Sequence, residues 1–195
     1  MALPLVARRS RQMSDDVDQL APIDRAADEM PEAVARLIKA YSAAGYTVET
    51  AQQTPTYSRL NVIGPSTESQ TKVELVAEFL RHAPVPSELG PVPHRYDVAA
   101  GKTGALFTRA EAHDAIDVDG LLKTGYSRER LIELAAQNDA GFDRRMFADA
   151  LRHVQHYTDK QYAAYGLDAQ AAAALRRQFN DWQQQLTQPE SDQDR

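Results

Sequence analysis

Two aspartates one residue apart, Asp16 and Asp18, are the first residues whose types and spacing could carry chemistry. If their segment is a strand, residues i and i+2 project from the same face. Two adjacent carboxylates repel each other, and a hard divalent cation relieves that repulsion. The stretch Ser-Asp-Asp-Val-Asp is equally suited to a polar turn. The pair alone therefore leaves a metal site and a surface loop both open.

A second feature is the pair Lys72 and Glu74 in an otherwise apolar strand predicted over residues 71–79. The two side chains could form a surface ion pair. Alternatively, Glu74 could be a third carboxylate beside Asp16 and Asp18 on a neighbouring strand. Three carboxylates on adjacent strands are a common way to hold two Mg²⁺ ions at a phosphoryl-transfer site.

A third group of charges lies in the predicted helices that follow. Lys102 and Arg109 are seven residues apart, and Asp114 and Asp117 are three apart, so each pair shares a helix face. The four could form a salt-bridge network between two helices. They could equally supply a Lys and an Arg that bind a triphosphate, with an Asp that orients the Lys. The spacing leaves both interpretations open; in the motif order described below, we expect Asp117 to face Lys102 and Asp114 to pair with Arg109.

Composition narrows the classes of protein to which these residues can belong. The chain has 195 residues, no cysteine, 43% hydrophobic and 26% charged residues, and a net charge of −6. Zero cysteine excludes a disulfide framework, a thiolate metal site and a cysteine nucleophile. No apolar run has the length of a membrane helix, and the apolar start followed by arginines reverses the order of a secretory signal. These features predict a cytoplasmic protein that makes no membrane contact.

Periodicity predicts an α/β (α+β) protein: a small mixed-sheet core over residues 1–95, a helical domain over 96–188 and a polar tail over 189–195. The expected strands cover residues 14–20, 46–50, 57–63 and 71–79. Pro31 is expected to open a helix that Gly45 closes. Residues 81–95 contain four prolines and predict an extended loop.

The C-terminal half is predicted to be helical throughout. Residues 97–123 are expected to form a helix broken near Ala112-His113. Ser127, Asp143 and Asp168 are each expected to cap the start of a later helix.

Five short motifs follow one another in an order that resembles a known family. They are S-x-D-h-D at residues 14–18, T-P-T-Y-x-R-L at 54–60, T-K-V-E-L at 71–75, K-x-x-A-L-x-x-R at 102–109 and H/R-D-x-x-D-h-x-x-L at 113–121. Together they resemble the AbiEii/AbiGii toxin nucleotidyltransferases, a family that includes the MenT-type toxins, which modify tRNA. The resemblance implies a DNA polymerase β-like nucleotidyltransferase core followed by a helical bundle.

The resemblance also implies roles for individual residues. Asp16 and Asp18 would be metal ligands, and Glu74 would stand at the third acidic position. Lys102 would match the catalytic lysine, and Asp117 would match the acidic residue of the last motif.

Nucleotide binding is a further implied role, assigned to Ser14, Lys102 and Arg109. Ser14 occupies a position at which related toxins carry a Ser or Thr that an antitoxin kinase phosphorylates. The family has a helix and a Gly-Gly strand–turn before the stretch that matches residues 2–9, so we expect either that the chain is an N-terminally truncated copy or that its true start lies upstream of Met1.

The function implied is that of a Mg²⁺-dependent nucleotidyltransferase toxin of a toxin–antitoxin system. It would transfer NMP from an NTP to an RNA acceptor, with tRNA expected, and would have a cognate antitoxin. The alternative is an inactive, truncated family member that acts only as an antitoxin-binding protein.

Overall fold

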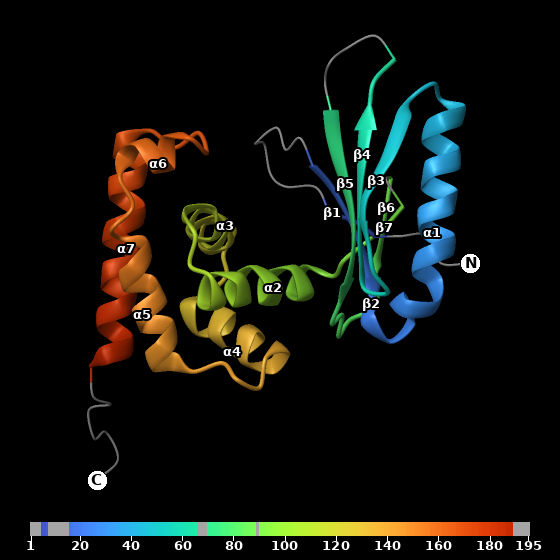
Figure 1. The fold of residues 1–195 in the computed structure, drawn as a ribbon. Helices are drawn as coiled ribbons and strands as arrows, with labels where there is room; N and C mark the ends of the chain where they lie inside the picture. The colour runs from blue at the N-terminus through green and yellow to red at the C-terminus, as the bar shows by residue number, and fades with distance from the viewer. Residues whose placement is uncertain (1–4, 8–15, 66–69, 89, 189–195) are drawn as a thin grey trace. The chain divides into compact units, whose positions relative to one another are not determined.

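The structure, a computed structural model, describes residues 5–7, 16–65, 70–88 and 90–188 (Figure 1). The chain divides into two compact units, Met1–His94 and Arg95–Arg195. The described part of the first unit carries strands and one long helix, whereas that of the second carries helices alone. The predicted α/β class is therefore confirmed.

The elements of the first unit run in the order β-β-α-β-β-β-β-β. They are β1 (Leu5–Ala7), β2 (Asp16–Pro22), α1 (Ile23–Ala43), β3 (Thr47–Gln53), β4 (Tyr57–Ile63), β5 (Gln70–Glu78), β6 (Val85–Ser87) and β7 (Gly90–Val92). The elements of the second unit are α2 (Arg95–Thr108), α3 (Ala112–Lys123), α4 (Arg128–Asn138), α5 (Arg144–Val154), α6 (Asp159–Ala163) and α7 (Ala169–Thr187).

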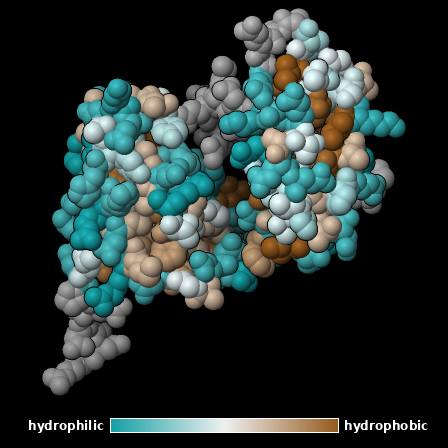
Figure 2. Space-filling view, in the orientation of Figure 1, coloured by the Kyte–Doolittle hydropathy of each residue, from teal (hydrophilic) through white to brown (hydrophobic). Residues whose placement is uncertain are grey.

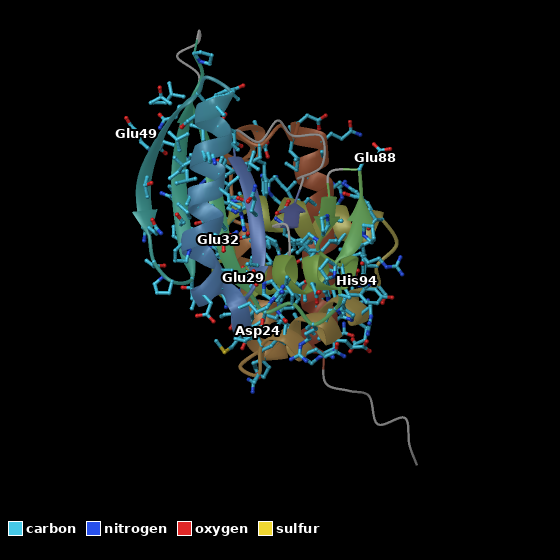
Figure 3. The ribbon with its side chains drawn as sticks, turned by 90° about the vertical axis from the view of Figure 1, so that its right-hand side faces the viewer. Asp24, Glu29, Glu32, Glu49, Glu88 and His94 are labelled. Carbon is cyan, nitrogen blue, oxygen red and sulfur yellow. The ribbon has the colours of Figure 1, made fainter. Side chains whose placement is uncertain are left out.

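A five-stranded sheet in the order β1-β2-β5-β4-β3 forms the centre of the first unit. β2 and β5 pair in parallel, and the other neighbours are antiparallel. Alternation along β4 and β5 buries one face, where Leu60 and Val73 pack with Met30 and Val34 of α1. Figure 3 shows α1 lying across this face of the sheet. The alternate residues, including Glu74, therefore point to the opposite face.

The helix α1 begins at Ile23, so the prediction that Pro31 opens it is wrong. Pro31 lies inside the helix, where it removes one backbone hydrogen bond at a cost of roughly 3 kcal/mol. Burial of Met30 and Val34 contributes about 1.5–3 kcal/mol each, which offsets that cost. The helix ends as predicted: Gly45 has a φ of +87°, and the amide of Tyr46 donates to the carbonyl of Tyr41.

The segment predicted as an extended loop contains a hairpin of β6 and β7 instead. Its four prolines did not prevent pairing, because Pro86 and Pro91 face each other in a ladder of only two strands. At an edge position the missing N–H of a proline would not have been paired with another strand, so no ladder hydrogen bond is lost. Ser87 closes the turn, since its hydroxyl donates to the carbonyl of Gly90.

The break between the first two helices of the second unit lies at residues 109–111, before the predicted position at Ala112-His113. Glu111 is the N-cap of α3, and its backbone amide is bonded by the side chain of Asp114 in a capping box. Arg109 consequently lies in the link between the helices and does not share a helix with Lys102.

The three predicted helix caps are confirmed by hydrogen bonds. The side chains of Ser127, Asp143 and Asp168 each accept from backbone amides in the first turn of their helices. Phe147, Phe179 and Trp182 form the aromatic centre of the helical core. The outer surface of the C-terminal helices is mostly hydrophilic in the view of Figure 2. Among the described helices, none has both the length and the apolar composition needed to cross a membrane.

Candidate functional site

The pairing of β2 with β5 brings two predicted metal ligands to neighbouring positions. Asp18 pairs with Glu74 in the parallel register, and Asp16 pairs with Lys72. Paired residues of adjacent strands project from the same face, at a strand spacing of about 4.8 Å. The side chains of Asp18 and Glu74 therefore project from the face of the sheet opposite to α1, and Asp16 occupies an alternate backbone position along the same strand as Asp18.

Glu74 is held by two side chains from β4. The hydroxyl of Tyr57 donates to Oε1 of Glu74 at 2.7 Å, and Nε of Arg59 donates to the same oxygen at 2.8 Å. Burial alone would raise the pKa of Glu74, but the hydrogen bonds from Tyr57 and Arg59 outweigh it and lower the pKa below its ordinary value. Glu74 is therefore a carboxylate that the fold keeps ionised.

The second unit carries the predicted lysine–aspartate pair. Nζ of Lys102 on α2 donates to Oδ2 of Asp117 on α3 at 2.7 Å. Both side chains are partly exposed, at 27% and 21%. The pairing is confirmed, and it leaves two of the three ammonium protons of Lys102 for other acceptors.

The expected pairing of Arg109 with Asp114 is also confirmed, and the carboxylate of Asp114 is more buried than that of an exposed surface pair. Nε and one terminal nitrogen of Arg109 bind both oxygens of Asp114, at 2.7 to 3.1 Å. The carboxylate of Asp114 is completely buried and also accepts from the amide of Glu111. This ion pair therefore closes the link between α2 and α3.

Glu111, His113 and Asp114 form a group whose ligand atoms lie within 4.8 Å of one another. Such a carboxylate–imidazole set could hold a metal ion. However, Arg109 already neutralises Asp114, and its terminal nitrogen lies 3.0 Å from Nε2 of His113. A cation at this point would meet that guanidinium.

Several predicted residues lie beyond what the structure describes. Ser14 falls outside the described residues, and for Asp16 only the backbone is described. Conversely, residue-by-residue assignment gave no role to Tyr57 or Arg59, although both stand in the T-P-T-Y-x-R-L motif. Their spacing of two, on a strand next to Glu74, is the signal that could have identified them.

Comparison with known proteins points to one family. The family described as nucleotidyl transferase AbiEii toxin, type IV toxin–antitoxin system, matches residues 1–195. No curated protein sequence matches the chain.

Two solved structures share the fold. One is a crystal structure from H. pylori assigned as a nucleotidyltransferase, with 14% identity, a TM-score of 0.55, and coverage of 95% of this chain and 88% of that one. The other is MenT4, a nucleotidyltransferase toxin from Mycobacterium tuberculosis H37Rv, with 14% identity, a TM-score of 0.54, and coverage of 97% and 77%. At this identity the likeness is one of fold.

Proposed function

The chain belongs to the AbiEii family of toxin nucleotidyltransferases, and from that premise we propose that it transfers NMP from an NTP to an RNA acceptor in a Mg²⁺-dependent reaction. Family membership implies a nucleotide substrate and an antitoxin partner. The proposed acceptor is a tRNA, and the proposed compartment is the cytoplasm, where NTP and tRNA are both abundant.

The observation that carries the proposal is the pairing of Asp18 with Glu74 on parallel strands, with Asp16 one alternate position away. Carboxylates are the ligands that Mg²⁺ prefers, and two or three of them on one face are a suitable donor set. Bound Mg²⁺ would neutralise the charge that develops on the attacking and leaving oxygens.

The overall reaction is a substitution at phosphorus. A hydroxyl oxygen of the acceptor forms a bond to the α-phosphorus of the NTP, and the bond between that phosphorus and the bridging oxygen breaks. Pyrophosphate leaves, and the proton of the hydroxyl passes to solvent or a nearby base.

We assign to Lys102 the role of a cation for the triphosphate, and to Asp117 the role of fixing its direction. The bond of 2.7 Å from Lys102 to Asp117 and the partial exposure of both side chains support this assignment. Such positioned charge is the main catalytic device in phosphoryl-type transfer. Ser14 and Arg109 stay predicted nucleotide contacts. Because Arg109 already binds Asp114 through two of its nitrogens, a phosphate would have to use the rest of its guanidinium.

The direct test is transfer of label from each of the four α-³²P-labelled NTPs to total RNA, with Mg²⁺ or with EDTA. We expect labelling of RNA of tRNA size with Mg²⁺ only, and its loss in Glu74→Gln and Lys102→Ala. Labelling that EDTA does not reduce would remove the metal from the proposal. If no NTP labels any RNA while the folded protein still binds its antitoxin, the alternative of an inactive binding protein would replace it.

A further inference from the structure

We propose, on the basis of the function above, that Tyr57 and Arg59 are positioning residues that hold Oε1 of Glu74 on the β4 side and thereby leave Oε2 as the oxygen that binds a divalent cation beside Asp18. The inference concerns how one metal ligand is oriented. It assigns roles to two residues that would act on the metal only through Glu74.

The two hydrogen bonds converge on a single oxygen. Tyr57 and Arg59 both donate to Oε1, at 2.7 and 2.8 Å, and within the described part of the chain no hydrogen bond to Oε2 is seen. A carboxylate has about four lone-pair positions, so it can accept two donors on one oxygen and still ligate through the other. Oε2 of Glu74 is therefore the ligand atom that neither of these two contacts uses.

Sheet topology gives this division of the carboxylate a direction. β5 lies between β4 and β2, and Glu74 pairs with Arg59 on one side and with Asp18 on the other. The residues that hold Oε1 come from the β4 side. The carboxylate with which Glu74 would share a cation comes from the β2 side.

The hold on Oε1 is itself supported from several directions. The amide of Tyr57 donates to the hydroxyl of Thr54 at 2.9 Å, which closes the turn before β4. The guanidinium of Arg59 lies 5.7 Å from the ring centroid of Tyr57, in cation–π range. Each donor thus constrains the other, and a glutamate with three rotatable bonds is restrained near its carboxyl end.

Arg59 has two opposing effects on a cation at Glu74. Its positive charge repels the cation, while its hydrogen bond prevents the carboxylate from rotating away. We expect orientation to prevail, because Arg59 binds the oxygen that the cation does not use and is itself 43% exposed, so water screens its charge. Loss of a group that orients a metal ligand typically lowers metal affinity roughly 10–100-fold.

The test measures the binding of Mn²⁺ alone to Tyr57→Phe and Arg59→Ala. Electron paramagnetic resonance reports the concentration of the free ion. We expect each variant to bind Mn²⁺ about 10-fold more weakly than the wild type, and Arg59→Lys to lose less than Arg59→Ala. Matched controls are Tyr46→Phe, an exposed tyrosine that packs on Tyr41, and Arg36→Ala, whose partner Glu32 is labelled on α1 in Figure 3. The controls should bind Mn²⁺ like the wild type.

A second readout is the Mg²⁺ dependence of label transfer. If orientation of the ligand is what Tyr57 supplies, the activity of Tyr57→Phe should fall at low Mg²⁺ and return at high Mg²⁺, with the KM for NTP unchanged. A loss that high Mg²⁺ does not restore would contradict positioning, since it would indicate a purely structural role.

The outcomes separate this inference from the function on which it rests. If Glu74→Gln leaves Mn²⁺ binding unchanged, Glu74 is not a ligand, and both the metal assignment and the inference fail. If Glu74→Gln weakens Mn²⁺ binding but Tyr57→Phe and Arg59→Ala do not, only the inference fails. Tighter Mn²⁺ binding in Arg59→Ala would mean that Arg59 competes with the cation, which would also overturn it.

Discussion

Two ion pairs connect the start of the helical unit, and they use their charges differently. Lys102–Asp117 joins α2 to α3 through one hydrogen bond and is partly open to solvent. Arg109–Asp114 closes the link between the same helices through three hydrogen bonds, and its carboxylate is fully buried. Although both pairs join a basic residue of α2 or its link to an aspartate of α3, the two pairs therefore differ in how many further contacts they can make.

That difference separates a group that can serve a ligand from one that cannot. Asp114 directs both of its oxygens to Arg109 and the amide of Glu111, so it has little capacity left for substrate. Lys102 has one bonded proton and two more to offer. Burial and hydrogen-bond saturation thus favour a structural role for Asp114, whereas Lys102 keeps the donors that its proposed role requires.

The largest effect should follow from removing the exposed pair. We expect Lys102→Ala and Asp117→Asn to lower label transfer about 10²–10³-fold, because a well-placed cation stabilises charge in the transition state. The free energy of unfolding, measured with denaturant, should change by less than about 1 kcal/mol, as for other partly exposed pairs. Lys123→Ala, which breaks an ion pair with Asp119 on the same helix α3, is the matched control and should leave transfer unchanged. The reverse pattern, full activity with a large loss of stability, would erase the distinction between the two pairs.

The next effect is on stability and concerns the buried pair. Asp114→Asn keeps the shape of the side chain but removes the charge that Arg109 binds, so we expect a loss of about 2–3 kcal/mol in the free energy of unfolding. Asp149→Asn, in the exposed pair with Arg152, should cost less than about 0.5 kcal/mol. Equal losses in urea unfolding of the two variants would show that burial does not distinguish these pairs.

Much of this arrangement could be predicted from the sequence where local pattern decides structure. Alternation predicted the strands now seen as β4 and β5, and therefore the face to which Glu74 points. The order of the matched motifs, together with charge, predicted the partners of Lys102 and Asp114, although the helix face predicted for Lys102 and Arg109 was wrong. Side chains such as Ser127 predicted helix starts, because capping is a local hydrogen bond.

The errors arose where distant contacts outweigh local preference. Pro31 is a helix opener by local rules, yet burial of its neighbours against the sheet carries α1 through it. The proline-rich segment forms a hairpin because its prolines take edge positions that only pairing reveals. Tyr57 and Arg59 were not assigned a role because their bonds to Glu74 depend on the register between β4 and β5, which the spacing of the two residues only suggests.

The smallest expected effect concerns Tyr162, a third polar group of the helical unit, whose contribution to stability should also depend on its burial. Its ring is fully buried, and its hydroxyl donates to the carbonyl of Val154 at 2.6 Å. Burial raises the pKa of Tyr162 from 10.0 to about 12, so the folded state keeps its proton where the unfolded state loses it. The contribution of Tyr162 to the free energy of unfolding is therefore fully present below pH 10 and is lost as the pH rises toward 12. At pH 11.5 the loss should be about 2 kcal/mol. Urea unfolding from pH 8 to 11.5 should show a shallower alkaline decline in Tyr162→Phe, together with a pH-independent loss of about 1 kcal/mol from the missing hydrogen bond. The exposed Tyr46→Phe should decline like the wild type, and an unchanged alkaline slope in Tyr162→Phe would contradict this dependence on burial.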